Sequence, residues 1–199
     1  SEGQSLADKL GGTFFKHNVT DEDRWIEIIK ETEEKYGRID ILVNNAGIVK
    51  PGNPENQTTE EYRFTMSVHM DSTFFGCKYV IPVMAKTGGG SIVNMCSIAS
   101  VQGESYVAAY CAAKGAIEAY SRAVAVHCGL AKNGVRCNTI HPSGIATPMV
   151  ASVPALMEEK FGASPVVQEA PVESNKVGEP LDIANASLYL ASAESKFVN

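Results

Sequence analysis

A tyrosine and a lysine lie four residues apart, at Tyr110 and Lys114, and a serine, Ser97, lies thirteen residues before the tyrosine. Side chains at positions i and i+4 project from the same face of a helix. A phenol with a pKa of about 10 is a poor base at neutral pH, and a nearby ammonium group stabilises the phenolate. Such a pair could exchange a proton with an alcohol or carbonyl oxygen, which the Ser97 hydroxyl would hold.

The spacing of Tyr110 and Lys114 is weak evidence by itself. Seven tyrosines and twelve lysines in 199 residues produce roughly 0.4 such pairs by chance. The alternative is an aromatic side chain packed on a helix beside a solvated lysine. The proton-transfer hypothesis therefore depends on the elements that surround the pair.

Short apolar runs alternate with longer helical patterns along the chain. Strands are expected at Thr13–His17, Ile39–Val43, Ser91–Met95 and Val135–Ile140. Helices are expected at Ser1–Leu10, from Thr20-Asp21 to about Tyr36, and at Thr58–Lys86, Ser105–Leu130 and Leu181–Ala193. This alternation predicts an α/β fold of three layers, in which a doubly wound parallel sheet lies between helices.

Small or polar residues follow each expected strand. They form the turns Asn18-Val19, Asn44–Gly47, Cys96–Ser100 and His141–Met149. Any one of them is explained as an ordinary turn. Because ligands bind beyond the carboxyl ends of parallel strands, four such turns at one edge predict a shared cleft.

The composition excludes several classes of protein. With 44% hydrophobic and 20% charged residues, the 199-residue chain is typical of one globular domain. A net charge of -6 without a basic run disfavours nucleic-acid and membrane partners. The five cysteines include no C-x-x-C pair and the four histidines are scattered, so we expect free thiols, a cytoplasmic protein and no metal.

Taken together, the motifs resemble those of the short-chain dehydrogenase/reductase family, most of all its bacterial hydroxysteroid and secondary-alcohol dehydrogenases. The segment Asp40–Gly47 is similar to the family's D-x-L-V-N-N-A-G motif, and Ser97 with Tyr110–Lys114 is similar to its Ser and Y-x-x-x-K motif. Arg136–Met149 and Gly178–Ala184 resemble the family's later segments. The resemblance covers nearly the whole chain.

The resemblance implies a Rossmann-like enzyme that interconverts a secondary alcohol and a ketone with NAD or NADP, of which NAD is favoured. Tyr110 would be the general acid/base, Lys114 would lower its pKa, and Ser97 would orient the substrate oxygen. A homotetramer or homodimer is implied as well. The implied cofactor-binding residues are Asn18, Val19, Asn44, Ala46, Gly47, Tyr110, Lys114, Pro142, Gly144, Ile145 and Thr147.

Two departures from the family pattern stand out. His69 lies where the family commonly has an asparagine that supports a water-linked proton path. It could replace that polar link, or it could simply be hydrogen-bonded within the helix packing. The run Pro142-Ser143-Gly144 replaces the usual P-G-x, which displaces the glycine by one position.

The segment after His141–Met149 bears on the substrate. Val150, Val153, Leu156 and Met157 suggest an apolar lid, and Phe161–Gly178 is expected to be a loop or lid. An apolar lid suits a bulky, hydrophobic or steroid-like alcohol. The alternatives are a 3-oxoacyl-carrier-protein reductase and a non-catalytic dinucleotide-binding protein.

The length leads to a further expectation. By family comparison, Thr13–His17 is the third strand of a single Rossmann-like domain spanning residues 1–199. The first βαβ unit, with its glycine-rich phosphate turn, and the last strand would then be missing. We therefore expect the chain to be part of a longer protein.

Overall fold

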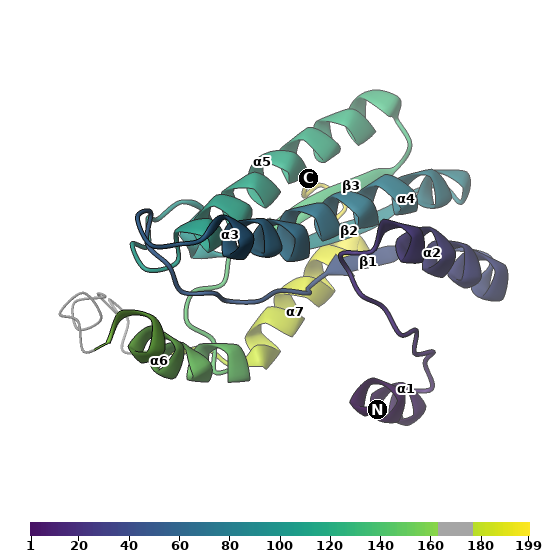
Figure 1. Ribbon diagram of the computed structural model, residues 1–199. Coiled ribbons are helices and arrows are strands. Elements are labelled where there is room, and N and C mark those ends of the chain that lie inside the picture. The colour runs from purple at the N-terminus through teal and green to yellow at the C-terminus, as the bar shows by residue number, and fades with distance from the viewer. Residues whose placement is uncertain (163–176) are drawn as a thin grey trace.

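A parallel three-stranded sheet lies at the centre of the computed structural model, which describes residues 1–162 and 177–199 (Figure 1). Its strands are β1 (Ile41–Asn44), β2 (Gly90–Met95) and β3 (Val135–Ile140), in the order β1-β2-β3. Asn44 is paired with Asn94, and Asn94 with Thr139. The expected loop or lid at Phe161–Gly178 lies mostly outside the described residues.

Seven α-helices lie in the described part of the chain, and none of them is long and apolar enough to cross a membrane. They are α1 (Glu2–Leu10), α2 (Glu22–Tyr36), α3 (Thr59–Met66), α4 (Ser72–Lys86), α5 (Ala108–Ala131), α6 (Pro148–Phe161) and α7 (Pro180–Ala191). All five expected helical regions are helical. The region Thr58–Lys86 departs from expectation because a π-helical turn, η1 (Ser67–Asp71), separates α3 from α4.

Helices cover the central strand β2 on both faces, so the α/β prediction is confirmed. Alternate residues of a strand point to opposite faces. Ile92 belongs to the core formed with α2, α4 and α5, whereas the Ser91 hydroxyl donates to the Leu190 carbonyl oxygen of α7 at 2.8 Å. The main hydrophobic core consists of Trp25, Ile29, Cys77, Val80, Val83, Met84, Ile92, Val124, Cys128, Val135 and Cys137.

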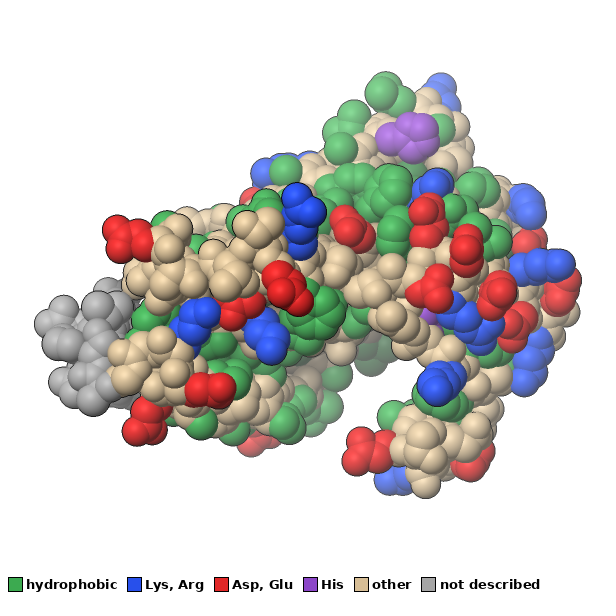
Figure 2. Space-filling model, in the orientation of Figure 1, with side chains coloured by type: hydrophobic (Ala, Val, Ile, Leu, Met, Phe, Trp, Pro, Cys, Tyr) green, Lys and Arg blue, Asp and Glu red, His purple; other side chains and the backbone are tan. Residues whose placement is uncertain are grey.

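The expected strand at Thr13–His17 is wrong. The segment runs between α1 and α2 without regular structure, and Thr13 accepts a hydrogen bond from Lys35 of α2. A strand requires the backbone of a neighbouring strand, and no described residue pairs with this segment. Helix α1 stands apart from the sheet and has no buried residue (Figures 1 and 2).

A buried amide network connects β1, β2 and α5 just below the carboxyl edge of the sheet. The Asn94 side chain is 0% exposed, accepts from Asn44 Nδ2 and donates to Ser121 Oγ, both at 2.8 Å. The approach of Asn44 requires a glycine on α4, because a Cβ on Gly76 would lie 2.6 Å from Asn44 Oδ1. The network therefore sets the spacing between the sheet and the helices that cover it.

Replacing Asn94 with leucine should destabilise the protein. The apolar side chain would remove the partner of Asn44 Nδ2 and one partner of Ser121, at a cost of about 1–3 kcal/mol for each group that stays unpaired. Urea unfolding of Asn94→Leu measures this cost. Asn138→Leu on the more exposed β3 surface is the control and should change stability by less than about 1 kcal/mol. Equal unfolding midpoints for Asn94→Leu and the wild type would contradict the role of the network.

Candidate active site

Ser97, Tyr110 and Lys114 are brought together at the carboxyl edge of β2. Ser97 follows that strand and begins the short helix η2 (Ile98–Ser100), while Tyr110 and Lys114 lie in the first two turns of α5. Ser97 is 9% exposed and Lys114 is 4% exposed. Lys114 Nζ lies 5.5 Å from the centroid of the Tyr110 ring. Ser97 and Lys114 are buried, and Tyr110, which is partly buried, lies beside both of them.

The ammonium group of Lys114 is held by the end of β2. Its Nζ donates to the Met95 carbonyl oxygen at 2.6 Å. Burial disfavours the charged form and lowers the pKa of Lys114 from 10.5 to about 8. The side chain is therefore mostly protonated at neutral pH and supplies a positive charge beside Tyr110.

Tyr110 is hard to ionise in this structure. Burial raises the pKa of the Tyr110 phenol above its usual value, and hydrogen bonding with the Ser97 hydroxyl lowers it. The family resemblance implies that Lys114 lowers this pKa. Burial has the larger effect on the Tyr110 pKa, and the Lys114 ammonium is hydrogen-bonded to Met95. Tyr110 thus carries its proton at neutral pH and is suited to donate it.

His69 packs against the tyrosine from the π-helical turn. Its ring is 1% exposed and meets the Tyr110 ring edge to face, with 5.3 Å between centroids. Nε2 lies 2.8 Å from the Ile48 carbonyl oxygen and 3.2 Å from the Ile48 nitrogen, whereas Nδ1 is buried without a hydrogen-bond partner among the described residues. Burial and the charge of Lys114 lower the pKa of His69 to about 4, so the imidazole is neutral at physiological pH.

The π-helical turn η1 is stabilised by hydroxyl groups that follow it. Ser72 Oγ donates to the Val68 carbonyl oxygen at 2.6 Å, and Thr73 Oγ1 donates to the His69 carbonyl oxygen at 2.8 Å. Single π-helical turns within α-helices are frequent at functional sites. Apolar periodicity predicted one continuous helix here, and no signal in the sequence marked the π-helical turn.

Gly47 leaves space for His69. A Cβ on Gly47 would lie 2.8 Å from Cε1 of the imidazole, so a side chain there would displace the ring. The family resemblance implies a cofactor-binding role for this glycine, but its near neighbour is a side chain of the protein. Gly144 differs, because no atom lies within 4 Å of its would-be Cβ.

A second histidine joins the turns after β2 and β3. His141 Nδ1 lies 3.2 Å from the Ser97 carbonyl oxygen and 3.1 Å from Ser100 Oγ. The Ile98 amide nitrogen also donates to the Pro142 carbonyl oxygen at 3.0 Å. The backbone that carries Ser97 is therefore fixed by the neighbouring turn.

Cys96, Glu118 and His141 form a cluster that could be considered for a metal ion. Their donor atoms lie within 4.8 Å of one another. Each already has a protein partner: the Cys96 thiol donates to the Lys114 carbonyl oxygen at 3.1 Å, Arg122 donates to Glu118, and His141 contacts the turn after β2. We assign the cluster to holding α5 and the two turns together.

The loop expected at the nicotinamide end is held between β3 and the residues before α7. Ile145 forms a parallel bridge with Gly178, whose nitrogen donates to the Gly144 carbonyl oxygen at 2.9 Å. Thr147 caps α6 by accepting from the Val150 nitrogen at 3.3 Å. Pro142, Gly144, Ile145 and Thr147 thus lie in one anchored loop.

The other expected cofactor residues lie around β1. Asn44 has its amide directed to Asn94, so its side chain supports the sheet. Ala46 lies in the turn after β1, two residues before Ile48, whose carbonyl oxygen contacts His69. Asn18 accepts from Thr20 within its own turn at 3.2 Å, and no described contact joins it to Ser97, Tyr110 or Lys114. The carbonyl oxygen of Val19 accepts from the Trp25 indole at 2.9 Å.

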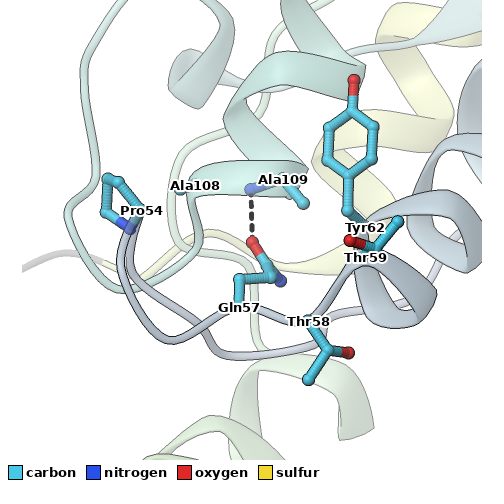
Figure 3. A pocket seen from close by; sticks show the side chains of 7 residues that line it. All are labelled: Pro54, Gln57, Thr58, Thr59, Tyr62, Ala108 and Ala109. Carbon is cyan, nitrogen blue, oxygen red and sulfur yellow. Dashed lines mark hydrogen bonds between the residues drawn. The ribbon is translucent and has the colours of Figure 1, made fainter.

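A small pocket of about 280 Å³ opens where α3 and α5 begin (Figure 3). Two of its lining residues immediately precede Tyr110 in the sequence, but neither Ser97 nor Lys114 lines the pocket. Its lining residues are Pro54, Gln57, Thr58, Thr59, Tyr62, Ala108 and Ala109. The hydrogen bond drawn in Figure 3 joins Gln57 to the Ala109 nitrogen across the pocket.

Comparison with known proteins identifies the family. Residues 1–199 match the family model described as enoyl-(acyl carrier protein) reductase. The chain is 40% identical over 201 residues to the NADP-dependent (R)-specific alcohol dehydrogenase of Lentilactobacillus kefiri, covering 98% of this chain and 77% of that protein. It is 36% identical over 201 residues to the 3-beta-hydroxysteroid dehydrogenase of Comamonas testosteroni, covering 99% and 77%.

Comparison with solved structures identifies the same family. A solved structure described as a short-chain dehydrogenase/reductase from Burkholderia xenovorans superimposes with a TM-score of 0.83 and 32% identity, over 98% of this chain and 73% of that one. This is a family of NAD(P)-dependent oxidoreductases that act on CH–OH groups. The chain belongs to the short-chain dehydrogenase/reductase family.

His69 should make the protein sensitive to acid. Its pKa is about 4 in the folded protein and 6.5 as the usual value, so between these pH values the unfolded chain binds more protons. The free energy of unfolding should therefore fall as pH drops from 6.5 to 4, by up to roughly 3 kcal/mol from this residue. In His69→Gln this contribution should be absent. Parallel pH profiles of unfolding for the two proteins would rule it out.

Proposed function

We propose that the protein interconverts a secondary alcohol and a ketone with a nicotinamide dinucleotide, and that Tyr110 is the general acid/base. The observation that carries this proposal is the convergence of partly buried Tyr110 with buried Lys114 and Ser97 at the carboxyl edge of the sheet. The alcohol and hydroxysteroid dehydrogenases that are similar to this chain support the same reaction by their names.

Each of the three side chains has a distinct part in ketone reduction. The Tyr110 hydroxyl, protonated because burial raises its pKa, donates its proton to the substrate oxygen. The Ser97 hydroxyl donates a hydrogen bond to that oxygen and holds it in place. The Lys114 ammonium stabilises the phenolate that remains. In alcohol oxidation the same phenolate takes the proton back.

A nicotinamide dinucleotide, when bound, supplies or accepts the hydride. The open space at Gly144 and the anchored loop to Thr147 fit a flat ring approaching the backbone, and Lys114 offers a buried cation to the ribose hydroxyls. We propose NAD or NADP as the cofactor, with NAD favoured. Because the Lentilactobacillus kefiri relative is named NADP-dependent, the two dinucleotides are to be compared directly.

The substrate we propose is bulky and hydrophobic, such as a cyclic or steroid-like alcohol. Helix α6 follows the anchored loop and carries Val150, Val153, Leu156 and Met157. Val150 is exposed and Met157 is buried, so the helix offers apolar groups both to the protein and to a ligand. The name of the Comamonas testosteroni relative, a hydroxysteroid dehydrogenase, supports this substrate class.

A 3-oxoacyl-carrier-protein reductase is the second candidate, and the description of the matching family model shares its acyl-carrier substrate class but names reduction of an enoyl double bond. It would use NADPH with 3-oxoacyl thioesters. A substrate panel separates the candidates, because turnover of thioesters without cyclic ketones would select the second. A non-catalytic dinucleotide-binding protein would turn over neither class and would bind dinucleotide equally well after Tyr110→Phe.

We also propose that the protein is a homotetramer or homodimer joined through α4 and α5. Hydrophobic side chains gather over these two helices in Figure 2. Phe74 of α4 is exposed although its ring contacts Tyr120 of α5, with 5.9 Å between centroids. A partner subunit would cover this apolar surface.

Removing the Tyr110 hydroxyl should abolish most of the activity. Tyr110→Phe keeps the ring that packs on His69 but cannot transfer a proton, so kcat for ketone reduction should fall about 10²–10⁴-fold. Tyr120→Phe, ten residues further along α5, is the matched control and should keep activity within about twofold. Retained activity in Tyr110→Phe would refute the proposed acid.

A charge on the α4–α5 surface should separate the subunits. Phe74→Glu buries a carboxylate in the proposed interface, which shifts the assembly to a smaller species in light scattering. Phe197→Glu introduces the same charge at the far end of the chain and should leave the mass unchanged. A wild-type monomer would contradict the proposed assembly.

A further inference from the structure

Helix α6 has a single polar link to another helix in the described part of the chain. Lys160 Nζ lies 2.9 Å from Glu61 Oε1 and 3.0 Å from Oε2 of α3, ninety-nine residues away in the sequence. Both side chains are more than two-thirds buried, at 25% and 29% exposed. The pair is therefore less screened by solvent than the ion pairs on the outer surface.

The carboxylate of Glu61 is also held by a hydrogen bond at the start of its own helix. Glu61 Oε2 accepts from the Thr58 nitrogen at 2.9 Å, and Thr58 Oγ1 accepts from the Glu61 nitrogen at 3.1 Å, which forms a capping box. Lys160 and the Thr58 amide hold the pKa of Glu61 below its usual range. Because the acceptor is preorganised, pairing costs less side-chain entropy than it does between two free side chains.

The same corner of the molecule also holds the start of the tyrosine helix. Val107, which precedes α5, provides no capping side chain. Instead, Gln57 Oε1 accepts from the Ala109 nitrogen at 2.9 Å, one residue before Tyr110 (Figure 3). The residues Gln57–Glu61, which we call the α3 corner, therefore contact α5 on one side and α6 on the other.

We propose that Lys160 and Glu61 are positioning residues that hold α6 against the α3 corner. Helix α6 carries the apolar side chains that we propose contact the substrate. The inference rests on the proposed function for the identity of the site, but the link between α6 and the corner is independent of it. Since α6 follows the loop ending at Thr147 and carries none of Ser97, Tyr110 and Lys114, loosening it should weaken substrate binding more than it slows proton transfer.

The test uses neutral variants that keep the local structure. Lys160→Met retains the apolar stem of lysine, and Glu61→Gln retains the capping box because glutamine also serves at that position. Each variant should raise KM for a bulky cyclic ketone about threefold or more, with kcat within about twofold. Lys160→Arg should restore the wild-type KM. The double variant should be no worse than either single variant, because both remove the same interaction.

Hydrogen exchange of α6 gives a readout that needs no turnover. Amides of residues 148–161 should exchange faster in Lys160→Met and in Glu61→Gln than in the wild type. The matched control is Lys86→Met, which breaks the 2.9 Å Lys86–Glu33 ion pair between α4 and α2 and should leave α6 exchange and KM unchanged.

The outcomes separate the two proposals. Unchanged exchange in α6 for both neutral variants overturns the positioning role, and so does faster exchange with an unchanged KM. If the wild type turns over neither ketones nor thioesters, the proposed function fails, while the exchange experiment still decides whether Lys160 and Glu61 hold α6.

Discussion

The buried ammonium of Lys114 is the constraint around which the site is arranged. A cation so far from water needs a strong acceptor, and the Met95 carbonyl oxygen at the end of β2 supplies it. This hydrogen bond holds the start of α5 against the end of β2 and so positions Tyr110. The same charge helps to keep His69 neutral, so that no second positive charge is buried near the Lys114 ammonium.

The parts of the site that depend on short-range patterns were predictable from the sequence. Apolar runs located β2 and β3, and the i, i+4 spacing put Tyr110 and Lys114 on one helix face. Contacts between distant segments were not predictable in this way. Periodicity cannot show that Thr13–His17 finds no neighbouring strand, nor that Ser67–Asp71 forms a π-helical turn.

Residues of the Asp40–Gly47 motif also have structural roles that the motif itself does not predict. Gly47 accommodates an imidazole, and Asn44 is part of the buried amide network with Asn94. The role of His69 is likewise set by contacts with distant parts of the chain, since it contacts Ile48 in the turn after β1 and Tyr110 of α5. A family motif identifies which residues gather at the sheet edge, whereas the packing behind them decides what each side chain does.

The π-helical turn also has a consequence for insertions and deletions. A turn with i→i+5 bonds holds one residue more than an α-helical turn, and each helical residue advances the chain by about 100°. In an unbroken α-helix, Thr65 and Cys77, which are twelve residues apart, would point about 120° away from each other. The π-helical turn accommodates the extra residue, so both side chains are buried. A one-residue deletion within Ser67–Asp71 that restored α-helical geometry would keep the two buried faces aligned, whereas the same deletion elsewhere in α3 or α4 would turn them apart. The extra residue in the π-helical turn therefore determines which side chains of α3 and α4 are buried on the same face.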